Sequence, residues 1–480
     1  MSQHSGDHLA DENQRPPIPR PLLATLMGSW VGTLCMGTVV GYSSPAKYSL
    51  EHTFKDGLHG FDLSANDWYD PLMTIGAILG AIVSGSVAQA LGRKSMLTVI
   101  SLGFMCGWTV TYLSRGNTFH IYSGRFLTGF SMGLVSLVAP CYVTEVTLPH
   151  NRGTMGGMLQ MTITVGIFYT YLLGRFLAWD YLALACMIPA ALLCICSMFC
   201  VESPRWHLLS GRKGQAMYDV RPRRSDALEC LFQLRGARAE EECMAIEMVY
   251  VTAPLPTAHV LLAAQVNFLQ QFSGINMIIF YTFNLFADAG MRIQEADCSI
   301  LIATLQVFAT MVAVAMMDMV TRRRLLLVSS HICVFSLIAM GAVAHVSTES
   351  EDRERDVLDR IPVLLVAFYM VGFSLGLGPV VWLLNAELVP CRGSGSLLAM
   401  VTAFNWTCAA GVTAFFEQVR DTLRLSGLGF FFSAITFIGA ILVTFLLPET
   451  GRITLEELLQ ENLFYAVEAQ PTAGRKSGKK

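Results

Sequence analysis

Charged residues are scarce in this 480-residue chain. Asp, Glu, Lys and Arg make up 14% of it, apolar residues make up 53%, and the mean hydropathy is +0.49. Soluble domains carry about 25% charged residues, so this composition excludes an ordinary soluble fold, and its apolar content excludes intrinsic disorder. The net charge of −3 gives no general excess of basic residues for binding nucleic acid. The chain is therefore predicted to be a membrane protein.

The apolar segments lack the residue-by-residue alternation that a transmembrane barrel requires. A helix that crosses the roughly 30 Å hydrocarbon layer needs about 20 apolar residues, and lipid obliges each span to satisfy its own backbone. Twelve stretches of suitable length are present, at about 22–42, 68–90, 95–114, 121–147, 155–177, 181–201, 257–287, 298–320, 324–346, 361–388, 394–417 and 427–447. The sequence therefore predicts an all-α membrane protein with twelve transmembrane helices.

Lys and Arg are concentrated in every second loop. They follow the second, fourth, sixth, eighth and tenth predicted spans and recur in the C-terminal tail. Because basic loops remain on the cytoplasmic side, both termini are predicted to be cytoplasmic. Residues 1–21 are polar and proline-rich and are expected to form a flexible cytoplasmic tail, and residues 448–480 a second one. The cell membrane is the expected location, with an intracellular membrane as the alternative.

The sequence contains an internal repeat. Residues 129–134 read GFSMGL and residues 372–377 read GFSLGL, and each is followed by a proline and then by a glutamate. The repeat predicts two six-helix halves, at 22–201 and 257–447, joined by a cytoplasmic linker with short helices at 202–256. Two such halves are a known transporter arrangement, with the binding site between them near mid-membrane.

Glycine and proline interrupt three of the predicted spans. Pro379 follows Gly376-Leu377-Gly378 in span ten, Ser273-Gly274-Ile275-Asn276 falls within span seven, and Gly41-Tyr42-Ser43-Ser44-Pro45 is predicted to end span one. Interrupted helices are tolerated in a membrane only where they face protein or a water-filled cavity. These interruptions are therefore expected to surround a binding site.

Amide side chains occur in the same spans, at Gln160, Gln270, Gln271 and Asn276. Amides both donate and accept hydrogen bonds, so they suit a neutral ligand with many hydroxyl groups. A charged substrate would require a buried countercharge that this set lacks. The alternative is that the amides only join helices to one another. Trp382 and Trp406 lie within spans rather than at interfaces, and they are predicted to form an apolar wall of the same site.

Acids and bases recur together at the predicted cytoplasmic ends of the spans: Glu145 with Arg152, Glu202 with Arg205, Asp318 with Arg322, and Glu387 with Arg392, together with Arg93. The repetition in both halves suggests salt bridges that join the halves and close the cytoplasmic side. The alternative is that these are solvated charges, each worth less than about 1 kcal/mol.

Several motifs resemble those of the sugar porter branch of the major facilitator superfamily, over roughly residues 25–460. They are QQFSGIN at 270–276, Gly124-Arg125-Phe126, Tyr142-x-x-Glu145, ESPRW at 202–206 and Pro448-Glu449-Thr450. GYSSPA at 41–46 and Asn405-Trp406-Thr407 resemble insect trehalose-type and animal hexose facilitators. The resemblance implies a sugar pocket lined by Gln160, Ile163, Gln270, Gln271, Asn276 and Trp382, with Phe373, Asn405 and Trp406 nearby. It also places Tyr281 at an extracellular gate and Arg125 among the gating residues.

The resemblance also bears on energy coupling. Proton-coupled relatives place an aspartate in span one near the arginine of span four, whereas this chain has Ser43 opposite Arg125, so no carboxylate is expected there. We therefore expect a monomeric uniporter that moves a hexose or trehalose-like sugar by alternating access. The alternatives are a proton-coupled sugar or polyol symporter and a non-transporting sugar sensor. No enzymatic activity, cofactor or metal is expected.

Overall fold

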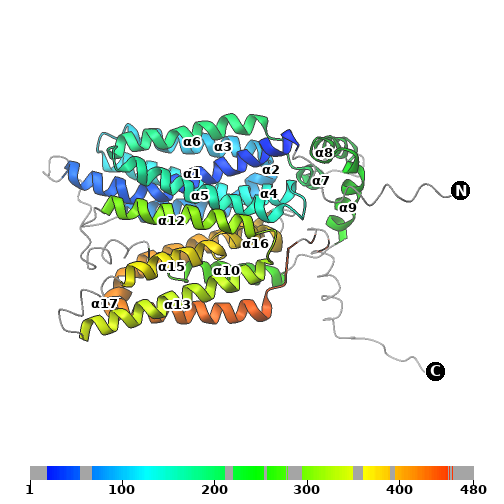
Figure 1. Cartoon of the computed structure of the whole chain (residues 1–480). Helices are drawn as coiled ribbons and strands as arrows, with labels where there is room; N and C mark the ends of the chain where they lie inside the picture. Colours follow the sequence, from blue (N-terminus) through cyan, green and yellow to red (C-terminus); the bar gives the residue numbers. More distant parts are fainter. Residues whose placement is uncertain are drawn as a thin grey trace, which may run out of the picture.

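The computed structural model describes residues 19–54, 68–210, 220–252, 257–276, 278, 295–349, 361–389, 395–451, 453 and 457. Regular structure in these residues is helical throughout, and eleven of the helical segments are long and apolar enough to cross a membrane. The second part of the predicted seventh span lies outside the described residues. The helices run roughly parallel and antiparallel to one another in one bundle (Figure 1). The predicted all-α membrane architecture is confirmed.

The first half consists of six helices: α1 (Arg20–Phe54), α2 (Tyr69–Leu91), α3 (Arg93–Tyr112), α4 (Thr118–Val146), α5 (Arg152–Gly174) and α6 (Trp179–Phe199). Here α2 packs on α4, α1 on α5, and α3 on both α4 and α6. Small residues allow the closest of these approaches. A Cβ added at Gly133 of α4 would lie 2.1 Å from the carbonyl oxygen of Ala77 in α2, so a larger residue would separate the two helices.

The second half consists of α10 (Thr257–Gln271), α12 (Glu295–Met316), α13 (Arg322–Glu349), α15 (Ile361–Leu375), α16 (Pro379–Leu388) and α17 (Ser396–Leu446). Two of the spans follow one another in α17, at Ser396–Phe415 and Ser426–Leu446. The left-handed backbone of Arg424, with φ 56°, separates them. Across the seam between the halves, α12 packs on α5 and α17 on α2.

Three short helices and one 3-10 turn follow the first half: α7 (Pro204–Ser210), α8 (Val220–Arg235), η1 (Gly236–Arg238) and α9 (Ala239–Thr252). Together they lie at one end of the bundle, which we call the linker end (Figure 1). Leu231, Ala239 and Cys243 form a small apolar core of their own between α8 and α9.

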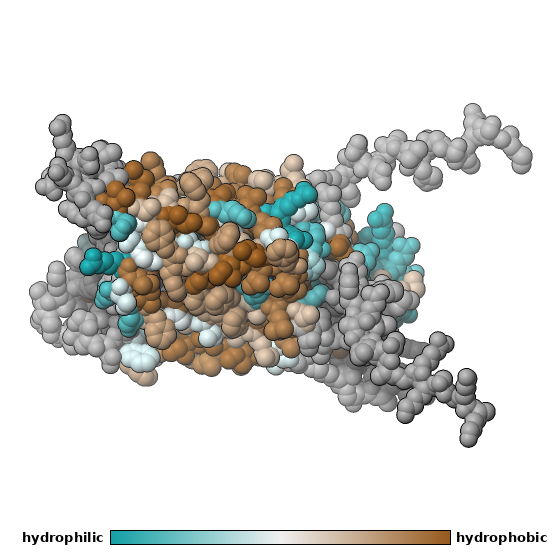
Figure 2. Space-filling view, turned by 90° about the horizontal axis from the view of Figure 1, so that it is seen from below, coloured by the Kyte–Doolittle hydropathy of each residue, from teal (hydrophilic) through white to brown (hydrophobic). Residues whose placement is uncertain are grey.

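Large apolar side chains cover the lateral surface of the bundle. Phe445, Phe176 and Leu364 are 81%, 77% and 72% exposed. Figure 2 shows hydrophobic residues over the side of the bundle and hydrophilic ones towards its ends. A surface of this kind is suited to lipid rather than water, because apolar patches of this extent are rare on soluble monomers.

The predicted end of span one is wrong. Helix α1 continues through Pro45 to Phe54. Tertiary packing supports the extension, because the Ser49 hydroxyl accepts a 3.1 Å hydrogen bond from the backbone N–H of Trp179 in α6, and Tyr42 donates a 2.7 Å hydrogen bond to the carbonyl oxygen of the same residue. Gly41 allows α1 to approach α5, since a Cβ there would meet the Thr170 hydroxyl at 2.1 Å. The residues predicted to break this helix instead allow it to pack closely.

The other two interruptions are confirmed. Helix α10 ends at Gln271, and Gly274 then adopts a left-handed backbone with φ +94°. Helix α15 ends at Leu375, a turn follows, and α16 begins at Pro379. Pro379 occupies the first turn of its helix, where its missing N–H leaves no hydrogen bond unmade.

Candidate functional site

The break between α15 and α16 is held in place from α10. The side-chain nitrogen of Gln270 donates to the carbonyl oxygens of Leu377 at 2.8 Å and of Gly378 at 3.3 Å. A break in a buried helix frees carbonyl groups that need partners. The side chain of Gln270, which is 3% exposed, is the hydrogen-bond partner of both carbonyl groups. One predicted pocket residue therefore stabilises the interrupted helix.

The predicted amides of the second half form a connected cluster. Asn276 donates to Gln271 at 3.4 Å, and Gln271 donates to Asn405 at 3.2 Å. Asn405 donates to Gln270 at 3.0 Å. Gln271 and Asn276 are partly exposed, whereas Asn405 is completely buried. The structure therefore brings these four amides together.

Two members of this cluster escaped the sequence analysis. Asn405 also donates to Asn267 at 2.7 Å, and Asn267 donates to Asn385 of α16 at 2.6 Å. The available signal was spacing, because Asn267 precedes Gln270 by three residues and so lies on the same face of α10. Asn385 carries the same signal as the predicted amides, since it is an amide in an otherwise apolar span, and it was overlooked.

Gln160 faces this cluster from the first half. It is 7% exposed and makes no side-chain hydrogen bond with any residue in the described part of the chain. A Cβ added at Gly378 would lie 3.6 Å from its amide carbon, so Gln160 adjoins the α15–α16 break across the seam. Ile163 follows one turn later and is 6% exposed. Gln160 thus retains its capacity to donate and accept hydrogen bonds.

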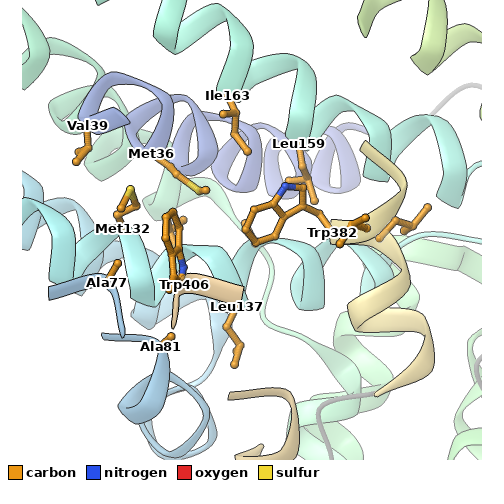
Figure 3. Close-up of a cluster of buried hydrophobic side chains, with 14 of the residues drawn as sticks. Met36, Val39, Ala77, Ala81, Met132, Leu137, Leu159, Ile163, Trp382 and Trp406 are labelled. Carbon is orange, nitrogen blue, oxygen red and sulfur yellow. The ribbon is translucent and has the colours of Figure 1, made fainter. Parts of the chain in front are cut away.

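Trp382 and Trp406 lie side by side at the seam. Their ring centroids are 6.5 Å apart, and each residue is 7% exposed. Figure 3 shows their rings among apolar side chains of the first half, including Met36, Met132 and Ile163. The Trp406 indole N–H donates to the Ser136 hydroxyl of α4 at 3.1 Å. Phe373, 6% exposed, stacks on Tyr369 in α15 with a 6.4 Å centroid separation.

These groups define the chemistry that the seam can accommodate. Uncharged donors and acceptors lie beside two indole rings, and the amide cluster contains no titratable side chain. Such a site suits a neutral ligand with several hydroxyl groups and an apolar face. In the described part of the chain, no group of three or more His, Cys, Asp or Glu residues could hold a metal ion.

At the linker end, Arg93 of α3 and Glu145 of α4 form a buried two-point ion pair. Arg93 donates from Nε at 3.0 Å and from Nη2 at 2.9 Å to the two carboxylate oxygens of Glu145. Arg205 donates to the backbone carbonyl of Glu145. An arginine–carboxylate pair joined by two parallel hydrogen bonds, as in Arg93–Glu145, is among the stronger kinds of side-chain contact.

Glu202 and Glu449 occupy equivalent positions in the two halves. Glu202 accepts hydrogen bonds from the backbone N–H groups of Arg93 at 2.7 Å and Lys94 at 3.2 Å, and so caps α3. Glu449 caps α13 through the N–H groups of Arg322 at 3.0 Å and Arg323 at 3.2 Å. A carboxylate is favoured at a helix N-terminus. Burial raises the pKa of Glu202, and the N–H donors oppose that rise.

Among the described residues of the predicted charge set, each ion pair at this end lies within one half. Arg322 lies 3.8 Å from Glu387, which also accepts a 2.6 Å hydrogen bond from Thr450. Arg93, Glu145, Arg322 and Glu387 thus pair within their own halves, and for the other members of the predicted set the joining of the halves by ion pairs stays a prediction. Each arginine reaches the glutamate of its own repeat, because the loop and the helix end adjoin there. Arg392 lies outside the described residues.

Hydrogen bonds also cross the seam at the linker end. The Asp318 carboxylate accepts a hydrogen bond from the backbone N–H of Thr154 at 3.0 Å. The Arg152 guanidinium donates to the carbonyl oxygen of Ile453 at 3.0 Å. Both contacts involve the first turn of α5, so this turn joins the halves.

The opposite end of the bundle also has a contact across the seam, which the sequence analysis missed. Arg175 at the end of α5 pairs with Asp297 of α12 at 3.1 Å. Their side chains are 38% and 46% exposed, so the pair contributes less than about 1 kcal/mol. Tyr281, the predicted gate residue, lies outside the described residues.

Arg125 of α4 is completely buried near that same end. Its guanidinium lies 4.6 Å from the centre of the Tyr69 ring, and it donates to the Ser43 hydroxyl, as the resemblance implied. It also forms a 3.2 Å ion pair with Asp70. The expectation of no carboxylate near Arg125 is therefore wrong, because α2 supplies one that span one lacks.

Comparisons with known proteins agree with this architecture. The chain resembles the proton:xylose symporter XylE bound to 6-bromo-6-deoxy-D-glucose, with a TM-score of 0.77, 19% identity, and coverage of 92% of this chain and 99% of that one. For the inward-open XylE from E. coli, the TM-score is 0.67, with 20% identity and coverage of 92% and 99%. The helical bundle and its division into two halves match these structures, so the chain has the twelve-helix fold of the major facilitator superfamily.

The family follows from the sequence. Residues 62–461 match the family described as "Sugar (and other) transporter", and the chain belongs to that family. The facilitated trehalose transporter Tret1 of Drosophila virilis is 31% identical over 446 residues, covering 91% of this chain and 48% of the relative. Tret1 of Aedes aegypti is 30% identical over 444 residues, covering 91% and 54%. The chain thus spans about half the length of the curated relatives it matches.

Proposed function

We propose that this protein carries a neutral sugar, of hexose to disaccharide size, across a membrane by facilitated diffusion. One observation carries the proposal. Gln160 retains unused hydrogen-bonding capacity on one side of the seam, opposite a hydrogen-bonded amide cluster and two indole rings on the other side. Hydroxyl groups can replace water at the amides, and a sugar ring can lie against the indoles.

Alternating access follows from the position of this site. The residues that would contact the sugar come from both halves, so rocking of one half against the other would expose the site to each side in turn. At the linker end, the Asp318–Thr154 and Arg152–Ile453 contacts would open in one state. Phe373, Asn405 and Ile163 would support the pocket rather than supply most of its polar contacts.

We place the protein in the cell membrane as a monomer, with the linker end and both termini on the cytoplasmic side. The excess of Lys and Arg in the loops of that end supports this orientation. The similar proteins named as facilitated trehalose transporters support transport without energy coupling and suggest trehalose or a hexose as the sugar.

The test is counterflow of labelled sugar in proteoliposomes that contain the purified full chain. Glucose, trehalose and inositol would be compared, with the membrane potential clamped by potassium and valinomycin. We expect saturable counterflow of at least one sugar, unaffected by a protonophore. Absence of counterflow for every sugar would refute transport and favour a sugar sensor.

Proton-coupled transport is the second candidate, because Asp70 places a partly exposed carboxylate 3.2 Å from Arg125. A carboxylate beside a buried arginine is a group at which a proton could be exchanged during transport. Concentrative uptake driven by a pH gradient, and abolished by the protonophore, would favour this candidate over uniport.

A further inference from the structure

A continuous line of hydrogen-bonded amides crosses the second half of the protein. Each member donates to the side-chain oxygen of the next, in the order Asn276, Gln271, Asn405, Asn267 and Asn385, with distances of 3.4, 3.2, 2.7 and 2.6 Å. The line begins at partly exposed residues and ends on the buried helix α16. Because hydrogen bonds in a chain polarise one another, a change at one end alters the groups at the other.

Asn267 is saturated by protein partners. Its side-chain nitrogen donates to Asn385 at 2.6 Å and to the Ala263 carbonyl at 2.6 Å. Its oxygen accepts from Asn405 at 2.7 Å and from Asn385 at 3.1 Å. An asparagine side chain offers two donor hydrogens and two acceptor lone pairs, and all four are used here. Asn267 is also completely buried, so it has no capacity left for a ligand.

Asn385 connects this line to the indole wall. It lies on α16 three residues after Trp382, and all ten residues of α16 are buried. The reciprocal Asn267–Asn385 hydrogen bonds therefore fix α16 relative to α10, while Asn405 brings in α17. The polar and apolar sides of the seam site are thus held as one unit.

We propose that Asn267 and Asn385 are positioning residues for sugar binding, which rests on the proposed function. They fix the orientation of the Asn405 amide and, through it, that of Gln271, whose nitrogen donates to the Asn405 oxygen. Without the Asn267 oxygen, the Asn405 side-chain nitrogen keeps one of its two hydrogen bonds among the described residues, the 3.0 Å bond to Gln270. The partly exposed amides then lose their fixed direction towards the sugar hydroxyls.

The double variant Asn267→Leu/Asn385→Leu distinguishes this positioning role from a purely structural role of the pair. Replacing both partners of a buried hydrogen bond by apolar groups of similar shape is nearly neutral for stability, whereas replacing one leaves the other unsatisfied. If the pair only joins helices, the double variant regains both stability and sugar affinity. If the pair positions Asn405, the double variant regains the stability that Asn385→Leu loses by leaving Asn267 unsatisfied, apart from the hydrogen bond that Asn405 still lacks, but it keeps the weakened affinity.

The experiment measures counterflow with labelled glucose and labelled trehalose, for the wild type, Asn385→Leu and the double variant. Half-saturation concentration and maximal rate are determined separately, and monodeoxy analogues of the transported sugar are used as competitors. The matched control is Thr402→Val, which removes a buried hydroxyl whose one hydrogen bond among the described residues goes to the Leu398 carbonyl within α17. Thermal unfolding in detergent reports the stability of each protein.

We expect a roughly fivefold rise in half-saturation concentration for both asparagine variants, from the loss of about one hydrogen bond. The maximal rate should change little, and the preference for the sugar over its deoxy analogues should narrow. Thr402→Val should change neither. Wild-type half-saturation and analogue preference in the double variant would overturn the assignment. If the wild type showed counterflow of neither glucose nor trehalose, the proposed function would be overturned for these substrates. The positioning role of Asn267 and Asn385 would then be overturned with it.

Discussion

The Asp318 carboxylate accepts a 3.0 Å hydrogen bond from the backbone N–H of Thr154 across the seam between the two halves. Thr154 lies in the first turn of α5, where unpaired N–H groups and the helix dipole favour a negative charge. Gly153 makes this approach possible, since a Cβ there would lie 2.3 Å from the carboxylate. The contact joins the two halves at the linker end, and in the proposed alternating-access cycle it would break when that end opens.

Replacing this carboxylate should favour opening of the linker end. Asp318→Asn keeps an oxygen that can accept the hydrogen bond but removes the charge, which is worth about 1 kcal/mol at a helix N-terminus. We expect the ratio of open to closed states to rise roughly fivefold. Hydrogen–deuterium exchange in the first turns of α5 measures this directly. Asp226→Asn, on the exposed surface of α8, is the control. Unchanged or slower exchange in Asp318→Asn would contradict the interpretation.

The Arg93–Glu145 pair should be important for stability. Lysine keeps the charge of arginine but cannot form the two parallel hydrogen bonds, so Arg93→Lys should lose about 2 kcal/mol. Both partners are buried, with side-chain exposures of 1% and 5%. The expected result is a lower thermal unfolding midpoint in detergent. Lys94→Ala at the adjacent position should leave the midpoint almost unchanged, and an equal loss in both variants would count against the pair.

Gln160 and Gln270 should respond differently to replacement by alanine. Gln160→Ala removes no hydrogen bond within the described structure, so it should weaken sugar affinity roughly fivefold without lowering thermal stability. Gln270→Ala leaves the Leu377 and Gly378 carbonyls without their donor, which should cost about 1–3 kcal/mol in stability as well.

Half-saturation concentrations and unfolding midpoints of the two variants provide the comparison. Gln418→Ala, at an exposed position of α17, serves as the control for both measurements. A Gln160→Ala protein with wild-type affinity would show that Gln160 does not contact the sugar.

Local sequence features predicted the parts of the fold that depend on local chemistry. Hydropathy predicts the spans, because lipid requires long apolar helices. Gly274 and Pro379 predict the breaks near them. Glycine can adopt a positive φ that ends a helix, and proline lacks the backbone N–H that a continuing helix needs. The same reasoning failed at Pro45, where the hydrogen bond from the Trp179 N–H to Ser49 and the packing on α5 and α6 support a longer helix.

Partners distant in the sequence were the parts that could not be predicted. Asn385 bonds to Asn267 across 118 residues, and nothing local to either one indicates the other. Glu145 was paired with a neighbour in the sequence, but its ion-pair partner Arg93 lies 52 residues away. Asp70 was missed for the same reason, since the carboxylate near Arg125 was sought only on span one. The residue types of the site were therefore predictable, whereas their connections depend on helix packing.

Replacing Asp70, which is paired with Arg125, should distinguish uniport from proton coupling. In a uniporter, Asp70→Asn retains an oxygen for the buried guanidinium, and sugar uptake is indifferent to a pH gradient in both the wild type and the variant. In a symporter, an inward proton gradient accelerates wild-type uptake at clamped potential, and the variant loses that acceleration. We expect indifference. Asp297→Asn is the matched control, because Asp297 is also paired with an arginine at the same end of the bundle. Acceleration that is lost only in Asp70→Asn would establish proton coupling, because the carboxylate that distinguishes the two mechanisms would then have been found on α2.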